Sequence, residues 1–160
     1  MIQEIQGLHY IQSPPVVYID LEGVKLSRNG SISIISIYID SRGFTYLVDV
    51  HTLRSAAFTI AAPNGTTLKS ILESPSIIKV FFDVRNDSDA LHHHYGVRLQ
   101  GIEDVQLMEN AVRRSSRAYL RGLERCIIDV APIPGKERKR WKEVKKAGIK
   151  LLAPEEGSSY

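Results

Sequence analysis

The pattern of apolar and polar positions predicts three strands near the start of the chain. Val16–Leu21 is an apolar, β-favouring run, and Ser31–Asp40 alternates small polar with apolar residues. Phe44–Val50 forms a third run of this kind. Arg28-Asn29-Gly30 and Ser41-Arg42-Gly43 supply turn residues between the runs. We therefore expect an antiparallel meander whose first strand begins at Val16.

After residue 50 the pattern changes to short helices and one buried strand. Leu53–Ile60 and Thr67–Glu73 are predicted helices, the second capped by Thr66 or Thr67. Ile77–Phe82 is an apolar run with β-branched residues, which is typical of a buried strand. Because a helical crossover leads to it, we expect this strand to lie parallel to the first.

The rest of the chain is predicted to be mainly helical. Asp87–Tyr95 should form a helix that ends at Gly96, and Gly101–Gln106 a short strand. The further predicted helices are Met108–Arg114, Ala118–Ile128 and Lys136–Ala147, the last after a break at Pro132–Gly135. This order of elements is typical of a ribonuclease H-like α/β domain. Such a domain has a mixed sheet in the order 3-2-1-4-5, with the second strand antiparallel and the first strand central. Ligands of open α/β sheets bind at the carboxyl ends of the strands.

Length and composition limit the class of protein. With 160 residues, 43% of them hydrophobic and 24% charged, the chain suits one globular domain. Its first 15 residues do not resemble a secretory signal, and no segment approaches the roughly 20 apolar residues of a membrane span. Cys126 is the only cysteine, which excludes an internal disulfide and a cysteine-based zinc site. We expect an intracellular location, in the cytoplasm or the nucleus.

The charges are unevenly distributed along the chain. Residues 1–110 hold 8 Lys/Arg against 12 Asp/Glu, whereas residues 111–150 hold 13 against 4. An acidic part followed by a basic part suits a metal site together with a polyanion-binding surface. A set of well-solvated helices would give the same distribution, so that alternative stays open.

Asp20 and Glu22 end the first predicted strand and are the strongest candidates for chemistry. Residues two apart in a strand point to the same face, so both carboxylates should project together from a central strand. Two like charges near a core are costly unless a cation or hydrogen bonds offset them. Magnesium takes oxygen ligands of this kind. The alternative is a polar strand end with two solvated acids.

Two stretches of the sequence resemble motifs of the DEDD superfamily of 3′–5′ exonucleases, which includes ribonuclease D and the proofreading domains of DNA polymerases. Asp20-Leu21-Glu22 resembles the first motif, Asp-x-Glu. Lys79–Leu91 resembles the second motif, in which an aspartate opens a helix about nine residues before the glycine of a Tyr/Phe-Gly pair. Counting back from Gly96 gives Asp87 as the second-motif ligand, with Asp89 as the alternative.

Further stretches extend this resemblance over nearly the whole chain. Ile102–Gln106 is similar to the family's Ile-Asp-Thr-Gln segment, whose aspartate, here Asp104, is more often a structural residue or cap than a ligand. The sequence of Arg85–Asp89, together with Leu123–Ile127 and Trp141-Lys142, is most similar to that of the ribonuclease D-like domains of fungal proteins and of animal relatives of Exuperantia.

The resemblance implies two-metal hydrolysis of phosphodiesters from the 3′ end of single-stranded RNA or DNA. Asp20, Glu22 and Asp87 would hold two Mg²⁺ or Mn²⁺ ions about 4 Å apart, and Glu22 would also orient the attacking water. Basic residues of the C-terminal part would hold the phosphate backbone without reading bases. Our candidates for these contacts are Lys139, Arg140 and Lys142.

The family's third motif places a Tyr or His four residues before a final aspartate. No such pair follows Leu152, and Glu155 and Glu156 do not have the required spacing. We therefore expect the domain to be incomplete at its C-terminus, so that the fourth ligand is missing from these residues. The alternative function is a catalytically inactive RNA-binding or scaffold protein that retains the exonuclease fold.

Two other clusters have simpler interpretations. His92-His93-His94 lie on a predicted helix, where consecutive residues point about 100° apart and cannot converge on one ion. We expect at least one of them to face solvent and another to pack under the sheet. Lys136–Lys146 is a nucleic-acid contact, a nuclear localisation patch or a solvated helix face, and its Trp141 is expected to anchor the helix rather than stack on a base.

Overall fold

A computed structural model describes residues 1–8, 16–131 and 133–151 of the chain. The chain divides into two compact units, Met1–Asp104 and Val105–Tyr160. Glu155 and Glu156, which were considered for the third motif, lie outside the described residues. Across the described ranges, no helix has the length and apolar character needed to cross a membrane.

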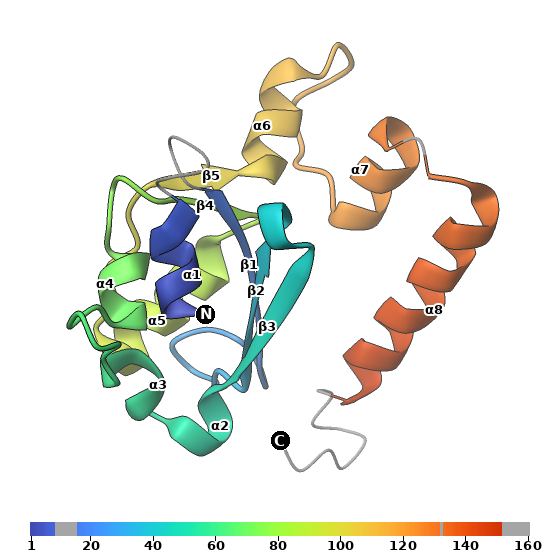
Figure 1. Ribbon diagram of the computed structural model, residues 1–160. Coiled ribbons are helices and arrows are strands. Elements are labelled where there is room, and N and C mark those ends of the chain that lie inside the picture. Colours follow the sequence, from blue (N-terminus) through green and yellow to red (C-terminus); the bar gives the residue numbers. More distant parts are fainter. Residues whose placement is uncertain (9–15, 132, 152–160) are drawn as a thin grey trace. The chain divides into compact units, whose positions relative to one another are not determined.

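A five-stranded mixed sheet forms the centre of the first unit (Figure 1). Its order is β3-β2-β1-β4-β5, with β2 antiparallel to both β1 and β3, and β4 parallel to both β1 and β5. The predicted fold class, strand order and central position of the first strand are confirmed. The strands are β1 (Val16–Glu22), β2 (Ile34–Ile39), β3 (Phe44–Asp49), β4 (Ile78–Phe81) and β5 (Ile102–Asp104).

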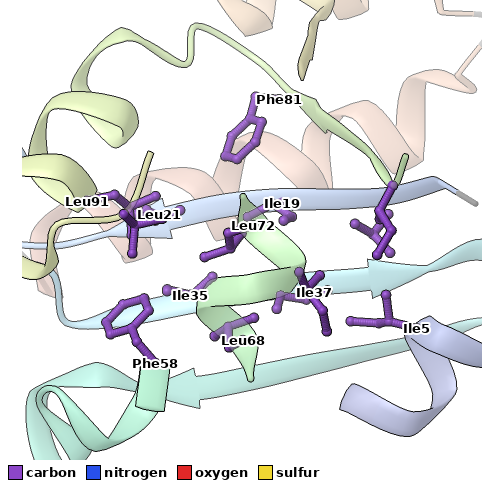
Figure 2. Packing of buried hydrophobic residues seen from close by; sticks show 14 of the residues in the cluster. Ile5, Ile19, Leu21, Ile35, Ile37, Phe58, Leu68, Leu72, Phe81 and Leu91 are labelled. Atoms are coloured by element: carbon purple, nitrogen blue, oxygen red, sulfur yellow. The ribbon is translucent and has the colours of Figure 1, made fainter. Parts of the chain in front are cut away.

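One face of this sheet packs against helices of the same unit. Figure 2 shows side chains from β1 and β2, such as Ile19 and Ile37, meeting Ile5, Phe58 and Leu72 from three helices. All of these side chains are almost completely buried. Burial of this apolar face supplies the main stabilisation of the unit. The opposite face of β1 stays exposed, and it carries the two acids.

The described residues of the first unit form the α-helices α1 (Ile2–Gly7), α2 (Val50–Leu53), α3 (Ala56–Thr59), α4 (Leu68–Leu72) and α5 (Arg85–Tyr95), and the 3-10 helix η2 (Asp40–Arg42). Helix α1 was not predicted, because six residues carry little periodic signal. It packs Ile5 into the core, and the Tyr46 hydroxyl donates a hydrogen bond to Glu4. The prediction of one continuous helix over Leu53–Ile60 is wrong. Arg54, with a φ of +51°, separates α2 from α3.

The ends of α4 and α5 follow the predicted capping chemistry. Thr67 caps α4 in a capping box: the Ser70 backbone N–H donates to the Thr67 hydroxyl, and the Thr67 backbone N–H donates to the Ser70 hydroxyl. Gly96 ends α5 with a φ of +63°, and its N–H donates to the carbonyl of His92 at 3.0 Å. The helix begins at Arg85, two residues before the predicted start, so Asp87 lies in its first turn.

Lys79 interrupts the apolar pattern of β4 and is completely buried. Its Nζ donates hydrogen bonds to the carbonyl oxygens of Ile71 at 3.3 Å and Ser74 at 2.5 Å. These carbonyls lie at the C-terminal end of α4, where cations and donors satisfy unpaired oxygens. Burial lowers the pKa of Lys79 to about 8. The lysine therefore joins α4 to β4 inside the unit.

The second unit contains α6 (Val105–Val112), α7 (Leu123–Val130) and α8 (Gly135–Leu151). The predicted start of a helix at Ala118 is wrong, since α7 begins at Leu123. Arginine side chains instead hold residues 113–122 in a non-helical segment. Arg113 forms an ion pair with Glu109 at 3.0 Å and donates to the carbonyl of Ser116, and Arg121 pairs with Asp129 at 2.7 Å. These side-chain bonds, between residues three to eight positions apart, take the place of the bonds of a helix turn.

Candidate functional site

The candidate site begins at the carboxyl end of β1. Asp20 and Glu22 are exposed on one face of this strand. Ile19 and Leu21 are only 4% and 3% exposed, because they point to the other face and into the core. The structure thus places both acids on the face opposite the helices.

Strand β4 leaves β1 before these acids. It pairs with β1 only from Val16 to Tyr18, whereas β2 accompanies β1 as far as Glu22. The chain continues from β1 to one side of the sheet and from β4 to the other, which makes this a topological switch point. In open α/β sheets such a point is where ligands bind.

Asp87, in the first turn of α5, approaches β1 at this point. Its side chain is buried, and its carboxylate accepts a hydrogen bond from the backbone N–H of Leu21. Burial raises the pKa of Asp87 to about 7, and the negative charge of Asp20 adds to the rise. The fold therefore brings Asp87 close enough to Asp20 for the charge of one to affect the pKa of the other, although they are far apart in the sequence.

Asp104 fixes the turn that leads into α5. Its carboxylate, at the end of β5, accepts hydrogen bonds from the backbone N–H groups of Asp83 at 3.0 Å and Val84 at 3.1 Å. Asp83 has a φ of +64°, a conformation that costs energy in a non-glycine residue and needs such support. The prediction that Asp104 is a structural residue is confirmed.

Asp89 lies two residues after Asp87 but has a different environment. It forms an ion pair with Arg28 at 2.5 Å and also accepts a hydrogen bond from the Arg28 backbone N–H at 2.8 Å. The Arg28 guanidinium holds the pKa of Asp89 below its usual value. Of the two second-motif candidates, Asp87 is thus beside Asp20, whereas Asp89 is bound to an arginine.

The carboxylates of Asp20 and Asp87 fit a hard divalent cation. Magnesium commonly binds through one or two carboxylates together with substrate phosphates. Asp87 is buried, has a raised pKa and lies near the carboxylate of Asp20. A cation bound between the two would stabilise the ionised form of both groups. Among the described residues, however, no three Asp, Glu, His or Cys side chains are close enough to hold a metal ion together. The structure therefore does not bring Glu22 into one cluster with Asp20 and Asp87.

The three consecutive histidines are all exposed. The expectation that one of them packs under the sheet is wrong, because Ala90 and Leu91 form the buried side of α5 together with Asp87. The Nε2 atom of His94 lies 3.0 Å from the carbonyl oxygen of Ser27. The histidine run thus contacts a neighbouring loop and does not form a cluster around one point.

The basic helix α8 carries some cations that are exposed and others that contact neighbouring side chains. Lys139 and Arg140 are exposed. The Nζ of Lys142 forms an ion pair with Glu124 of α7 at 2.8 Å. Trp141 is half-buried, and the Nζ of Lys145 lies 5.1 Å from the centroid of its ring. Of the three predicted phosphate contacts, Lys142 is therefore already held by a carboxylate.

Sequence reasoning missed two residues that organise the site. Arg28 was assigned only to a turn, since nothing in the local sequence indicates a partner on α5. Arg85, whose guanidinium binds the Asp83 carboxylate at 2.6 Å, was noted only as part of the second motif. For Arg85 the spacing to Asp83 was a usable signal. For Arg28 only the tertiary structure identifies the role.

Comparisons with known proteins identify the family and agree with the fold. A sequence profile described as 3′-5′ exonuclease matches residues 2–147. The piRNA biogenesis protein EXD1 of Mus musculus is 35% identical over 100 residues, which cover 62% of this chain and 16% of that protein. The chain therefore spans about a sixth of the length of this curated relative.

Solved structures show the same fold at lower identity. RNase D of Trypanosoma brucei in complex with GMP gives a TM-score of 0.66 at 23% identity, covering 92% of this chain and 43% of that one. Its complex with the RNA U12 gives 0.57 at 23% identity, covering 94% and 56%. NrnC of Brucella melitensis with bound Mg²⁺ gives 0.53 at 17% identity, covering 90% and 76%.

Proposed function

Because the chain belongs to the 3′–5′ exonuclease family, we propose that it hydrolyses phosphodiesters from the 3′ ends of single-stranded RNA or DNA. The observation that supports this most is the pair formed by buried Asp87 and Asp20 at the carboxyl end of β1. The RNA-bound relative supports a nucleic acid as the substrate. We place this activity in the cytoplasm or the nucleus, since a single cysteine suits a reducing compartment.

Three acids of this chain have distinct roles in the proposal. Asp20 and Asp87 would bind Mg²⁺ or Mn²⁺, and Asp87 would release its proton on becoming a ligand. Glu22, on the same face of β1 as Asp20, would orient the attacking water and add a further carboxylate to the ligand set. The chemistry supplied by the bound cations is activation of water and stabilisation of charge on the leaving 3′ oxygen.

The second unit would hold the phosphate backbone of the substrate. Exposed Lys139 and Arg140 on α8 are free to contact phosphates, in that neither forms an ion pair within the described part of the chain. Contacts of this kind bind nucleic acid without reading its sequence. Lys142 would join α8 to α7 through its ion pair with Glu124. It would contact a phosphate only after this ion pair breaks.

An RNA-binding protein without catalysis is the second candidate. The observation that favours it is the lack of any three-carboxylate cluster among the described residues. An inactive domain would still use the basic surface of α8, because phosphate binding does not need a metal ligand set. The two functions differ in what happens to a bound oligonucleotide.

We expect the full-length gene product to shorten a 5′-labelled single-stranded oligonucleotide stepwise from its 3′ end in Mg²⁺ or Mn²⁺. Asp20→Ala should reduce the rate at least about 100-fold, because it removes a metal ligand. Asp40→Ala, which removes an exposed acid of the same unit outside the site, should retain the rate. Gel analysis of the labelled products gives both rate and direction.

Degradation that persists in Asp20→Ala would contradict the proposed site. Tight binding with no shortening in either metal would support the RNA-binding function instead. An oligonucleotide with a blocked 3′ end should survive, since attack from the 5′ end or the middle would shorten it regardless of the block.

A further inference from the structure

Arg28, in the loop between β1 and β2 (residues 23–33), binds α5 through several hydrogen bonds. Arg28 donates its backbone N–H to Oδ2 of Asp89 at 2.8 Å and its Nε to Oδ1 at 2.9 Å. Its Nη2 donates to the same Oδ1 at 2.5 Å. Three donors of one residue thus converge on one carboxylate. Because the guanidinium and the backbone N–H bind different oxygens of it, the contact fixes both distance and orientation.

A second contact lies further along the same helix. Nε2 of His94 is 3.0 Å from the carbonyl oxygen of Ser27, the residue before Arg28. Asp89 and His94 therefore hold consecutive residues of the β1–β2 loop. This loop cannot slide along α5 without breaking both contacts.

The β1–β2 loop is itself compact, so the fastening extends to the end of β1. Its N–H groups at Gly30 and Ser31 donate to the carbonyls of Ser27 and Val24 at 3.1 and 3.0 Å. At Gly23, directly after Glu22, a Cβ would lie 1.9 Å from the carbonyl oxygen of Ser31. The loop closes tightly on itself where β1 ends.

The β1–β2 loop therefore connects the two halves of the candidate site. One end of it continues from Asp20 and Glu22, and its tip holds the helix that carries Asp87. Asp87 and Asp89 lie on the same helix turn, one directed to β1 and the other to Arg28.

We propose that Arg28 and Asp89 are positioning residues, which set the separation between the acids of β1 and Asp87 and thereby the affinity for a divalent cation. This inference rests on the proposed metal site. It gives Asp89 a role different from that of a ligand, even though its sequence position is two residues from Asp87.

The sign of one mutational effect separates the two roles of Asp89. If Asp89 positions α5, Arg28→Ala should weaken Mn²⁺ binding about 10-fold, the lower end of the loss that removal of supporting contacts around metal ligands commonly causes. If Asp89 is a ligand, Arg28→Ala should strengthen binding, since it frees the carboxylate and removes a nearby positive charge. Calorimetric titration of the chain with MnCl₂ measures this affinity.

A double-mutant cycle and a matched control complete the test. Asp89→Ala should weaken Mn²⁺ binding as much as Arg28→Ala, and the double variant should be no weaker than either by more than about twofold, because each change breaks the same pair. Arg125→Ala removes an ion pair of similar exposure, Arg125–Asp129 at 2.8 Å in the second unit. It should leave the affinity unchanged, whereas a loss equal to that of Arg28→Ala would overturn the proposal.

The outcomes also separate this inference from the function on which it rests. A wild-type chain that binds no Mn²⁺ overturns the metal site and the positioning role together. Wild-type binding with unchanged or stronger binding in Arg28→Ala overturns the positioning role alone. Arg28→Lys keeps the charge and the backbone donor but loses the two guanidinium bonds to Oδ1, so it should show an intermediate loss if position is what matters.

Discussion

Asp87 and Asp89 are two residues apart on α5, yet the fold gives their carboxylates opposite environments. Asp87 is buried next to Asp20, which raises its pKa to about 7. Asp89 is bound by the Arg28 guanidinium, which lowers its pKa. The ionised carboxylate is therefore destabilised at Asp87 and stabilised at Asp89.

The metal-free chain should lose stability as the pH rises through the pKa of Asp87. The folded-state pKa is about 7, above the unfolded value of about 3.9. The stability contributed by the protonated group is thus fully present below pH 4 and is lost as the pH rises towards 7 and above. Asp87→Asn removes this dependence. In urea unfolding with EDTA, the free energy of unfolding of Asp87→Asn relative to that of the wild type should rise between pH 4 and pH 8, by an amount of the order of 2–4 kcal/mol.

Asp89→Asn serves as a control, because its effect on stability should depend on pH in the opposite direction. Because the folded-state pKa of Asp89 is lowered, its contribution is present at neutral pH and is lost as the pH falls through the folded pKa. This variant should therefore be less stable than the wild type at pH 7, with the difference shrinking in acid. A shared sign for the two variants would contradict the environments assigned to them.

At the residue scale, local spacing was sufficient for some positions and insufficient for others. The alternation around Asp20 and Glu22, and the distance from Gly96 to Asp87, could be taken from the sequence alone. The partner of Arg28 lies 61 positions away, so only tertiary packing reveals it. The role of Lys79 likewise depends on α4 ending next to β4.

At the scale of elements, strands were predicted better than helices. The strands carry strong alternation and short turns, and four connections between them follow common rules. Apart from α5 and α8, the described α-helices have only four to eight residues, so a single backbone feature changes their bounds. Arg54 divides one predicted helix with its positive φ, and arginine side chains bind residues 113–122 into a segment without helix.

Helix α8 separates its basic residues by face. The partly buried positions Arg138, Lys142 and Lys145 recur at intervals of three or four residues, as expected for one side of a helix. The exposed cations occupy the other side: Lys136, Lys139, Arg140, Lys146 and Lys150. A polyanion would therefore meet the exposed set first.

Neutralising one exposed cation of α8 should reduce the salt dependence of oligonucleotide binding. Lys139→Gln should lower the slope of log K against log salt by about 0.7, since one phosphate contact to a single strand is lost. Lys142→Gln removes the same charge from a residue paired with Glu124 and should leave the slope nearly unchanged. Fluorescence anisotropy at several salt concentrations measures both slopes. Equal slopes for wild type and Lys139→Gln would exclude this contact.

At the scale of the whole molecule, the chain combines an acidic α/β unit with a basic helical unit. The strand order could be predicted because a meander followed by a parallel crossover leaves few arrangements. The match of the exonuclease family to residues 2–147 extends over both units. This distribution of charge supports the proposed metal site in the first unit and the proposed phosphate contacts of the second.

The location of a bound cation tests the metal site most directly. The anomalous scattering of manganese, recorded from a crystal of the chain soaked in MnCl₂, gives this location without reference to activity. We predict a peak within coordination distance of both Asp20 and Asp87, and its loss in Asp87→Asn. A peak at Asp89 or at His92–His94, or no peak beside β1 at saturating Mn²⁺, would contradict the account.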